Sequence, residues 1–419
     1  MYGNLDNNSI LSSMADIFNR FDNNLSSKEE LITDIYTQIK RILEVATDYG
    51  FDNNLWHNYL TYFLITNENP FSITCEKVGA NDGSVNIFAR NDFKVFYNLF
   101  HYDFSEIEEK LGIDCFSIIS NYKAIVKKEL MYNKNVSEKV RELSSRLERT
   151  KNENEFFDEV TEFYKAFGVG MFGLNKAFRI SSDEKDGLVF HPINNMDKVV
   201  LDDLIGYEIQ KQKLVENTEN FVQGRKANNA LLFGDSGTGK STSIKAIVNQ
   251  YYDQGLRMIE IYKHQFKDLS AIIAQVKNRN YRFIIYMDDL SFEEFEIEYK
   301  FLKAVIEGGV ETKPDNVLIY ATSNRRHLIK ETSRDRDDME HGEDMHRSDT
   351  MEEKLSLVNR FGLTIYYAKP DKSGFNAMAV ELARRAGITP EEMRDEEIGY
   401  EANRFEMRGG GLSGRTAQQ

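Results

Sequence analysis

Cysteine and long apolar runs are scarce in this sequence. Cys75 and Cys115 are the only cysteines among 419 residues, and no C-x-x-C or Cys/His metal spacing surrounds them. Neither a disulfide framework nor a zinc site is indicated, so we expect free, buried thiols in a reducing compartment. The first residues lack the basic and apolar regions of a signal peptide, and no apolar run approaches the roughly 18 residues of a membrane span. We expect a soluble, cytoplasmic protein that does not enter membranes.

Positive charge is also in deficit. The 53 Lys and Arg residues face 68 Asp and Glu residues, which leaves a formal net charge of −15 at pH 7. Binding along nucleic acid or anionic lipid depends on clustered Lys and Arg, so the composition argues against a chain that coats either over its whole surface. Nucleic acid is therefore not expected as a partner. The length predicts two or three domains, each able to bury its own core.

A glycine-rich segment in the middle of the chain has the pattern of a phosphate-binding loop. It consists of Gly234, Asp235, Ser236, Gly237, Thr238, Gly239, Lys240, Ser241 and Thr242. The pattern G-x-x-x-x-G-K-[ST] follows a short apolar run and precedes a helical one, so backbone N–H groups would surround phosphate oxygens at a helix N-terminus. Lys240 would reach the terminal phosphates and Ser241 would ligate Mg²⁺. The alternative is a glycine-rich turn with an unrelated lysine.

A second apolar run delivers two carboxylates at its end. The run Phe283–Met287 precedes Asp288 and Asp289. We expect it to form a strand beside the one that leads into the glycine-rich loop, so that Asp288 holds Mg²⁺ opposite Ser241. Asp289 would then orient or deprotonate a water molecule. A strand that ends in a solvated turn is the alternative.

The chain is expected to contain a helical part and an α/β part. Residues 1–180 are predicted to be a mostly helical N-terminal domain, and 181–198, which are polar, a linker. Residues 199–370 alternate apolar strands with helices, which predicts an α/β core with a largely parallel sheet. Residues 371–419 form a small helical lid, in which Thr389 is predicted to cap a helix. Residues 71–100 fit either a small hairpin or helix ends.

Two local patterns in the N-terminal part have a plain structural interpretation. Ser27 and Glu30 form a capping box that predicts a helix start. The stretch Gly168–Gly173 spells G-x-G-x-x-G, the dinucleotide fingerprint, but it follows a helical run and no strand-helix-strand unit surrounds it. We therefore reject a dinucleotide site there and expect a glycine hinge.

The order of these parts resembles the AAA+ ATPase superfamily. More narrowly, four stretches resemble an uncharacterised bacterial AAA+ family known as domain of unknown function 815. They are Leu-Asp-Asp-Leu-Ile-Gly-Tyr-Glu (201–208), Asp-Asp-Leu-Ser-Phe-Glu-Glu (288–294), Ala-Thr-Ser-Asn-Arg-Arg-His-Leu (321–328) and Ser-Gly-Arg-Thr-Ala (413–417). The similarity covers about residues 196–419. It implies a P-loop NTPase core with a helical lid, and ATP and Mg²⁺ as cofactors.

The resemblance also assigns roles outside the loop. Ile205, Gly206 and Tyr207 would form the box that lines the adenine pocket. Asn324 would be sensor 1, Arg360 in the Asn-Arg-Phe-Gly stretch an arginine finger for a neighbouring subunit, and Arg415 sensor 2 on the lid. For Arg360, a cation that caps a helix end or pairs with the acidic stretch 331–353 is the alternative.

Two departures from the superfamily pattern affect these roles. AAA+ Walker B motifs usually end in Asp-Glu, whereas this one ends in Asp288-Asp289, so turnover could be slow or the base could be Glu293 or Glu294. The chain also ends barely one turn into the helix that Ser413 would cap, so the lid could be incomplete.

The activity that the resemblance implies is hydrolysis of ATP at a subunit interface, which would drive an unknown remodelling task. It implies a homo-oligomer, either a ring or an open ring. An unknown protein partner would bind through the N-terminal domain. The alternative is an ATP-dependent switch or loader that docks a protein partner with little turnover.

Overall fold

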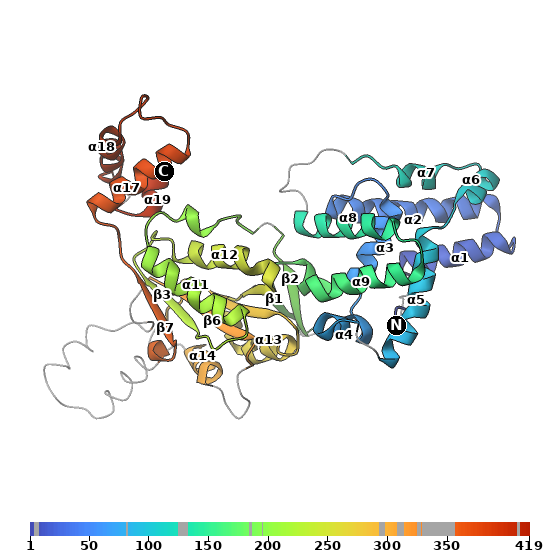
Figure 1. The fold of residues 1–419 in the computed structure, drawn as a ribbon, viewed down its shortest axis with the longest axis horizontal. Helices are drawn as coiled ribbons and strands as arrows, with labels where there is room; N and C mark the ends of the chain where they lie inside the picture. Colours follow the sequence, from blue (N-terminus) through green and yellow to red (C-terminus); the bar gives the residue numbers. More distant parts are fainter. Residues whose placement is uncertain are drawn as a thin grey trace. The chain divides into compact units, whose positions relative to one another are not determined.

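The computed structural model describes eleven stretches of the chain. They are residues 1–3, 8–80, 83–124, 133–183, 187–194, 196–292, 298–307, 314–324, 328, 357–408 and 411–419. The chain divides into two compact units, Met1–Asn175 and Lys176–Gln419 (Figure 1). Within the described residues, no helix is both long and apolar enough to cross a membrane.

The first unit is helical, as predicted. Its helices are α1 (Ile10–Asp22), α2 (Lys28–Tyr49), α3 (Leu55–Thr66), α4 (Pro70–Val78), α5 (Ser84–Phe100), α6 (Ser105–Leu111), α7 (Cys115–Ser120), α8 (Lys134–Glu148), α9 (Glu153–Phe167) and α10 (Gly170–Leu174). The stretch 71–100, for which a hairpin was one alternative, forms α4 and α5. Their apolar faces pack with α9 in one core, where Phe71, Phe93 and Phe157 are buried. Cys75 and Cys115 are free and buried, as expected.

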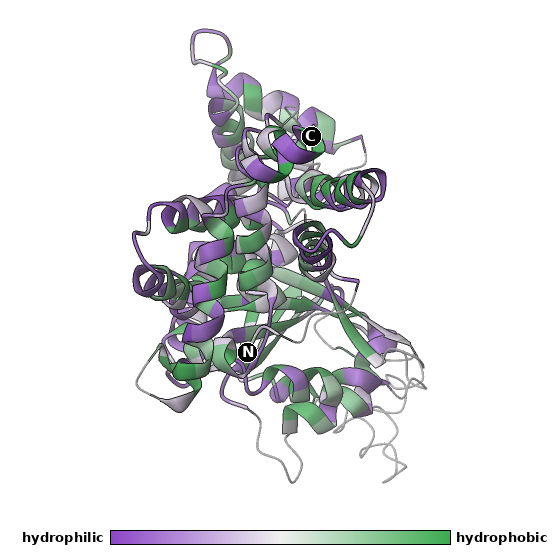
Figure 2. Ribbon diagram, turned by 90° about the vertical axis from the view of Figure 1, so that its right-hand side faces the viewer, coloured by the Kyte–Doolittle hydropathy of each residue, from purple (hydrophilic) through white to green (hydrophobic). Residues whose placement is uncertain are grey.

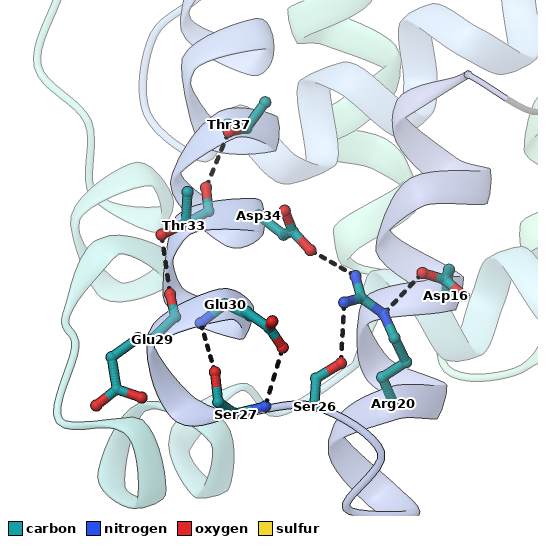
Figure 3. Close-up of polar contacts among 9 residues, drawn as sticks. All are labelled: Asp16, Arg20, Ser26, Ser27, Glu29, Glu30, Thr33, Asp34 and Thr37. Carbon is teal, nitrogen blue, oxygen red and sulfur yellow. Dashed lines mark hydrogen bonds and ion pairs between the residues drawn. The ribbon is translucent and has the colours of Figure 1, made fainter.

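The predicted capping box starts α2 (Figure 3). Glu30 N donates to Ser27 Oγ over 3.2 Å, and Ser27 N donates back to Glu30 Oε2 over 3.2 Å. Close by, the Arg20 guanidinium joins α1 to α2, because it bonds Asp16 over 2.8 Å and Asp34 over 2.6 Å. The cap satisfies amides that a helix start leaves without partners, and the arginine adds a polar contact between the two helices.

The stretch Gly168–Gly173 follows helix α9 and runs into α10, which confirms the helical run that was expected before the glycines. Gly168 and Gly170 have left-handed backbone angles, with φ of 80° and 72°. The amide of Val169 donates to the buried Glu76 carboxylate over 3.0 Å. An internal carboxylate therefore accepts a hydrogen bond from this loop.

The second unit is built on a seven-stranded sheet. Its strands are β1 (Ala177–Asp183), β2 (Gly187–Pro192), β3 (Ala230–Gly234), β4 (Leu256–Glu260), β5 (Arg282–Met287), β6 (Val317–Ser323) and β7 (Leu363–Tyr367), in the order β2-β1-β4-β5-β6-β3-β7. All neighbouring pairs are parallel except β1 with β2. The unit is thus an α/β fold with a mostly parallel sheet, as predicted.

The prediction of a linker at 181–198 is wrong for 181–183 and 187–192, which are strands. Residues 177–183 and 187–192 form the antiparallel pair β1–β2, and β1 pairs in parallel with β4 through Phe178 and Ile259. The pair lies at an edge of the sheet, and most of β2 is not buried. Polar residues are tolerated on such a half-exposed edge strand, so the composition resembled that of a linker.

Helices cover both faces of the sheet. The helices between its strands are α11 (Glu208–Val222), α12 (Lys240–Tyr251), α13 (Leu269–Val276) and α14 (Glu298–Glu307). Short 3₁₀ turns lie at η2 (Leu201–Asp203), η3 (Tyr252–Gln254) and η4 (Lys263–Asp268). Helices α11 and α12 share a core with alternate strand residues such as Leu232 and Tyr320. Figure 1 shows α13 on the opposite side of the sheet. In Figure 2 the strands are largely coloured as hydrophobic, which fits strands buried on both faces.

The C-terminal part is helical, with α17 (Lys372–Arg385), α18 (Asp395–Glu406) and α19 (Gly414–Gln418). The helix predicted to start at Thr389 is wrong, because Thr389 begins a turn and α18 starts six residues later. The backbone N–H of Thr389 donates to Glu392 Oε2 over 2.8 Å. The Thr-Pro-Glu-Glu stretch therefore closes a turn that does not continue as a helix.

The predicted neighbour relation between the two key strands is also wrong. Strand β5, which carries the two aspartates, does not lie beside β3, because β6 pairs with both of them. The carboxyl ends of parallel strands still lie at one edge of the sheet, so the end of β6 is inserted between the glycine-rich loop and the aspartates.

Candidate functional site

The glycine-rich loop connects β3 to α12 at the carboxyl edge of the sheet. Gly234 has φ of 135°, and a Cβ atom there would lie 2.1 Å from the carbonyl oxygen of Tyr367. Gly237 and Gly239 have left-handed φ angles of 78° and 89°. Only glycine adopts this run of angles readily, and the result is a backbone that curves around the N-terminus of α12.

Four further residues of the segment have distinct environments. Thr238 is buried and its hydroxyl donates to Asp235 O over 2.8 Å. Asp235 Oδ2 accepts a hydrogen bond from Lys369 N over 3.1 Å, which ties the loop to the chain that leaves β7. Ser236 is exposed, and Thr242 is half-buried in the first turn of α12.

Lys240 is buried at the base of the loop, with 6% of its surface exposed. Its ammonium contacts Gly234 O at 2.9 Å, Asp235 O at 2.6 Å and Asn324 Oδ1 at 3.0 Å. Burial lowers its pKa, and the nearby carboxylates act in the opposite direction. Among the described residues, the three oxygens that bond this cation are all neutral. An anionic oxygen in their place would form a stronger, charge-assisted hydrogen bond.

Ser241 and Asp288 meet as predicted, although β3, which leads to Ser241, is not a neighbour of β5, which leads to Asp288. Ser241 Oγ donates to Asp288 Oδ1 over 2.7 Å, and Thr322 Oγ1 donates to the same oxygen over 2.6 Å. Burial raises the pKa of Asp288, but hydrogen bonds, that of Thr322 first, outweigh it and lower the pKa. The carboxylate is thus ionised and beside a hydroxyl, a pair of oxygen ligands suited to Mg²⁺.

Asp289 lies on the other side of this cluster, next to Asn324. Asn324 Nδ2 donates to Asp289 Oδ1 over 2.7 Å, and both side chains are exposed at the edge of the sheet. Asp289 has a left-handed φ of 49°, one of four such values among non-glycine residues of the described chain. The carboxylates of Asp288 and Asp289 have different partners, since Asp288 accepts from Ser241 and Thr322. The alternative bases Glu293 and Glu294 lie outside the described residues, as does the acidic stretch 331–353.

The predicted adenine box lies against the loop. Gly206 and Tyr207 have φ of 80° and 63°, so the chain turns sharply there. Tyr207 donates its hydroxyl hydrogen to Ala368 O over 2.9 Å, and its ring centroid lies 5.2 Å from that of Tyr367. Burial, followed by the charge of Asp235, raises the pKa of Tyr207 to about 12. Ile205 in the same box is half-buried.

The helical lid reaches the same loop. Ser413 caps α19 by accepting from Thr416 N over 3.2 Å, as predicted for this serine. Arg415 N donates to Gly237 O over 3.4 Å, and a Cβ atom on Gly237 would lie 3.0 Å from Ser413 Oγ. The structure thus brings the backbone of Arg415 to the glycine-rich loop, and its side chain is exposed there.

Arg360 does not join this cluster. Strand β7 runs parallel to β3, with Leu363 opposite Ala230 and Tyr367 opposite Gly234, and Arg360 precedes the strand. At about 3.3 Å per residue, Arg360 lies more than about 13 Å from the loop. It lies where β3 and β7 begin, whereas the loop lies where β3 ends. Phe361 is buried and anchors the turn, while Arg360 is exposed.

Sequence reasoning assigned no individual role to two residues of the cluster, Thr322 and Tyr286. Thr322 lies two residues before Asn324 on β6 and is 2% exposed. Tyr286 lies two residues before Asp288 on β5, and its buried hydroxyl lies near the Asp288 carboxylate, whose pKa it helps to lower. Side chains two apart in a strand share a face, which is the signal that could have indicated both.

These groups fit a magnesium nucleotide. The loop provides a glycine backbone that a Cβ would obstruct, and Lys240 provides a buried cation. Ser241 and Asp288 would hold Mg²⁺, which usually binds one or two carboxylates together with phosphate and water. No group of three or more His, Cys, Asp or Glu side chains arranged for a metal occurs in the described part of the chain, so no separate all-protein metal cage is indicated there.

This chain is similar to two solved structures and matches one family model. Among solved structures, the Thermotoga maritima RuvB Holliday junction branch migration motor shares 17% identity, with a TM-score of 0.34 over 52% of this chain and 61% of its own. The FIGL-1 AAA domain in complex with ADP shares 19% identity, with a TM-score of 0.35 over 54% and 72%. The chain thus spans less than two thirds of the RuvB structure. No curated protein matches. The family described as protein of unknown function DUF815 matches residues 174–419, more than half of the chain, and the chain belongs to that family.

Proposed function

We propose that this protein is an AAA+ type ATPase that binds ATP and Mg²⁺ at the glycine-rich loop and hydrolyses ATP to ADP and phosphate. The observation that carries the proposal is the convergence of a buried lysine, a hydroxyl–carboxylate pair and an amide–carboxylate pair at one edge of the sheet. Lys240, Ser241 and Asp288 meet there with Asp289 and Asn324. The lysine would bind phosphate, the hydroxyl–carboxylate pair would coordinate the metal, and the amide–carboxylate pair would activate water.

The roles of the side chains follow from their contacts. Bound ATP and Mg²⁺ would supply an electrophilic terminal phosphorus and a stabilised leaving group. Lys240 would exchange its carbonyl partners for phosphate oxygens, and Ser241 with Asp288 would hold the cation. Asp289 would accept the proton of the attacking water, while Asn324 holds that carboxylate by its 2.7 Å hydrogen bond. Carboxylate and amide are then fixed before the substrate arrives, which lowers the reorganisation cost of the reaction.

We further propose that the complete site forms between copies of the chain. Arg360 is exposed at the edge of the sheet opposite its own loop, so it could contact a nucleotide only in another subunit. This placement supports a homo-oligomer, in ring or open-ring form, with Arg360 as the arginine finger. The helical first unit would then bind the protein partner that the ATPase acts on. The shorter Asp289 carboxylate favours the second candidate, an ATP-dependent switch or loader with little turnover.

The test compares wild type with Lys240→Ala and Lys245→Ala. Lys245 lies on the same helix but pairs with Asp197 over 2.7 Å, so it is a matched control. At ATP·Mg²⁺ about a hundred times its Kd, wild type should gain roughly 2.7 kcal/mol, or a melting shift of roughly 5–10 °C. We expect the Lys245→Ala variant to keep the shift and Lys240→Ala to lose it.

Phosphate release across a protein dilution series separates the two candidates. An ATPase that acts at subunit interfaces should show specific activity that rises with protein concentration. Binding without release at any concentration would favour the switch, and a wild type that binds no ATP would refute both.

A further inference from the structure

Thr322 occupies a central position among the site residues. It is 2% exposed on β6, the strand that lies between β5 and β3. Its hydroxyl donates to Asp288 Oδ1 over 2.6 Å and accepts from Asp289 N over 2.9 Å. Its carbonyl oxygen accepts from Leu290 N over 2.6 Å. One residue therefore holds three consecutive residues that follow β5.

The direction of these hydrogen bonds is determined by chemistry. A backbone N–H can only donate, so the Thr322 oxygen must accept from Asp289 N. The single hydroxyl hydrogen is then available for Asp288. An ionised carboxylate has no hydrogen to donate, so Asp288 must accept this bond. Thr322 thus links the position of the Asp288 carboxylate to the backbone of Asp289, where φ is 49°. Non-glycine residues adopt this left-handed angle only when their surroundings stabilise it.

A magnesium ion would increase the importance of this bond. The hydroxyl of Ser241, which now donates to Asp288 Oδ1, would turn its oxygen toward the metal. The Thr322 hydroxyl would then fix that carboxylate oxygen, with the buried Tyr286 hydroxyl beside it. Partners of this kind behind a metal ligand typically contribute 10–100-fold to metal affinity or activity.

We propose that Thr322 is a positioning residue that holds Asp288 in place for Mg²⁺ and holds the turn that aims Asp289. The proposal rests on the proposed function for its metal, and on the hydrogen bonds of Thr322 for its geometry. It implies that a hydroxyl is needed at position 322, whereas a methyl group of the same shape is insufficient.

The experiment compares Thr322→Val, which removes the hydroxyl at constant shape, with Thr322→Ser, which keeps it. Thr218→Val is the matched control, because Thr218 is also fully buried in this unit and its hydroxyl bonds Tyr320 Oη over 2.8 Å. We measure the Mg²⁺ concentration at which ATP binding is half-maximal, by calorimetry, together with kcat and KM. Thr322→Val should raise the Mg²⁺ midpoint about 10–100-fold and lower kcat more than it raises KM. Thr322→Ser and Thr218→Val should keep the wild-type midpoint.

A second measurement needs no nucleotide. Amide hydrogen exchange in peptides that span 288–290 should be faster in Thr322→Val than in wild type, and unchanged in Thr218→Val. If Thr322→Val does not fold, Thr322→Ala serves for both measurements. A wild-type Mg²⁺ midpoint in the hydroxyl-free variant, with wild-type ATP binding intact, would overturn the positioning role alone. A wild type that binds no ATP·Mg²⁺ would overturn the proposed function and the metal role together.

Discussion

Asn324 donates a 2.7 Å hydrogen bond from Nδ2 to Oδ1 of Asp289, which joins the ends of β6 and β5. The other end of the same amide, Oδ1, lies 3.0 Å from the Lys240 ammonium. One neutral side chain therefore separates a cation from a carboxylate. If ATP binds as proposed, its terminal phosphate would draw Lys240 away from Asn324 and leave the hydrogen bond of Asn324 to Asp289.

The Asp289→Asn variant should bind ATP and hydrolyse it slowly. Asparagine keeps an oxygen that accepts from Asn324 but cannot take a proton, and a general base contributes about 10²–10⁴-fold to rate. We expect kcat to fall by that factor in phosphate-release assays, while calorimetry shows an unchanged Kd for ATP·Mg²⁺. Asp288→Asn should instead weaken the Mg²⁺ dependence of binding. Wild-type turnover by Asp289→Asn would transfer the base role to Glu293 or Glu294, or remove it from the protein.

Arg360→Ala should retain ATP binding and lose turnover. An arginine supplied to the transition state is worth about 10³–10⁵ in rate, whereas an exposed ion pair contributes at most about 1 kcal/mol to stability. A matched control is Arg394→Ala, an exposed arginine of the lid that pairs with Glu397 over 2.7 Å. Mixing Arg360→Ala with Lys240→Ala subunits should restore part of the activity, because each supplies what the other lacks. Activity that is flat on dilution, with no recovery on mixing, would disprove the shared site.

Gly234→Ala should destabilise the second unit more than Gly255→Ala. Both glycines have positive φ, 135° and 91°, so alanine is strained at each by about 1–2 kcal/mol. Only at Gly234 would the new Cβ meet a backbone atom, the Tyr367 oxygen at 2.1 Å, whereas Gly255 has open space. Overpacking adds about 1–3 kcal/mol, so calorimetry should show a further loss of roughly 2–12 °C in Tm. Equal losses would mean that the loop can move away from Tyr367.

The buried His57 should make the first unit less stable in acid. Burial lowers its pKa, although the bond to Phe100 O and the Glu148 carboxylate 3.9 Å away oppose the shift. The unfolded chain takes up a proton near pH 6.5 while the folded His57 stays neutral to lower pH, so stability falls as pH drops below about 6.5. His57→Gln can still donate to Phe100 O and should show a smaller loss of Tm between pH 7 and pH 5.

The exposed His191 of the second unit offers the control for this pH dependence. His191→Gln removes a histidine that bonds Ser181 Oγ over 2.7 Å, outside the unit that contains His57. Unfolding of the first unit in this variant should follow the wild-type pH profile. If His57→Gln also follows that profile, the acid sensitivity of the first unit arises from other groups.

Local features of this protein were determined by the sequence alone. The loop from Gly234 to Ser241 needs left-handed glycines and a following helix, and both requirements concern residues close together in the chain. The same holds for the Ser27–Glu30 cap and for most strands, whose apolar runs are buried on both faces. Such constraints act over a few residues, so composition and spacing reveal them.

Tertiary structure alone decided which strands lie side by side. That β6 separates β3 from β5, and that the polar pair β1–β2 joins the sheet, depends on backbone pairing between residues far apart in the sequence. Thr322 became part of the site only through that insertion, because its hydroxyl reaches Asp288 across 34 residues of chain. Strand pairing uses backbone groups that every residue carries, so side-chain patterns do not encode the partner, and only the folded sheet shows which side chains meet.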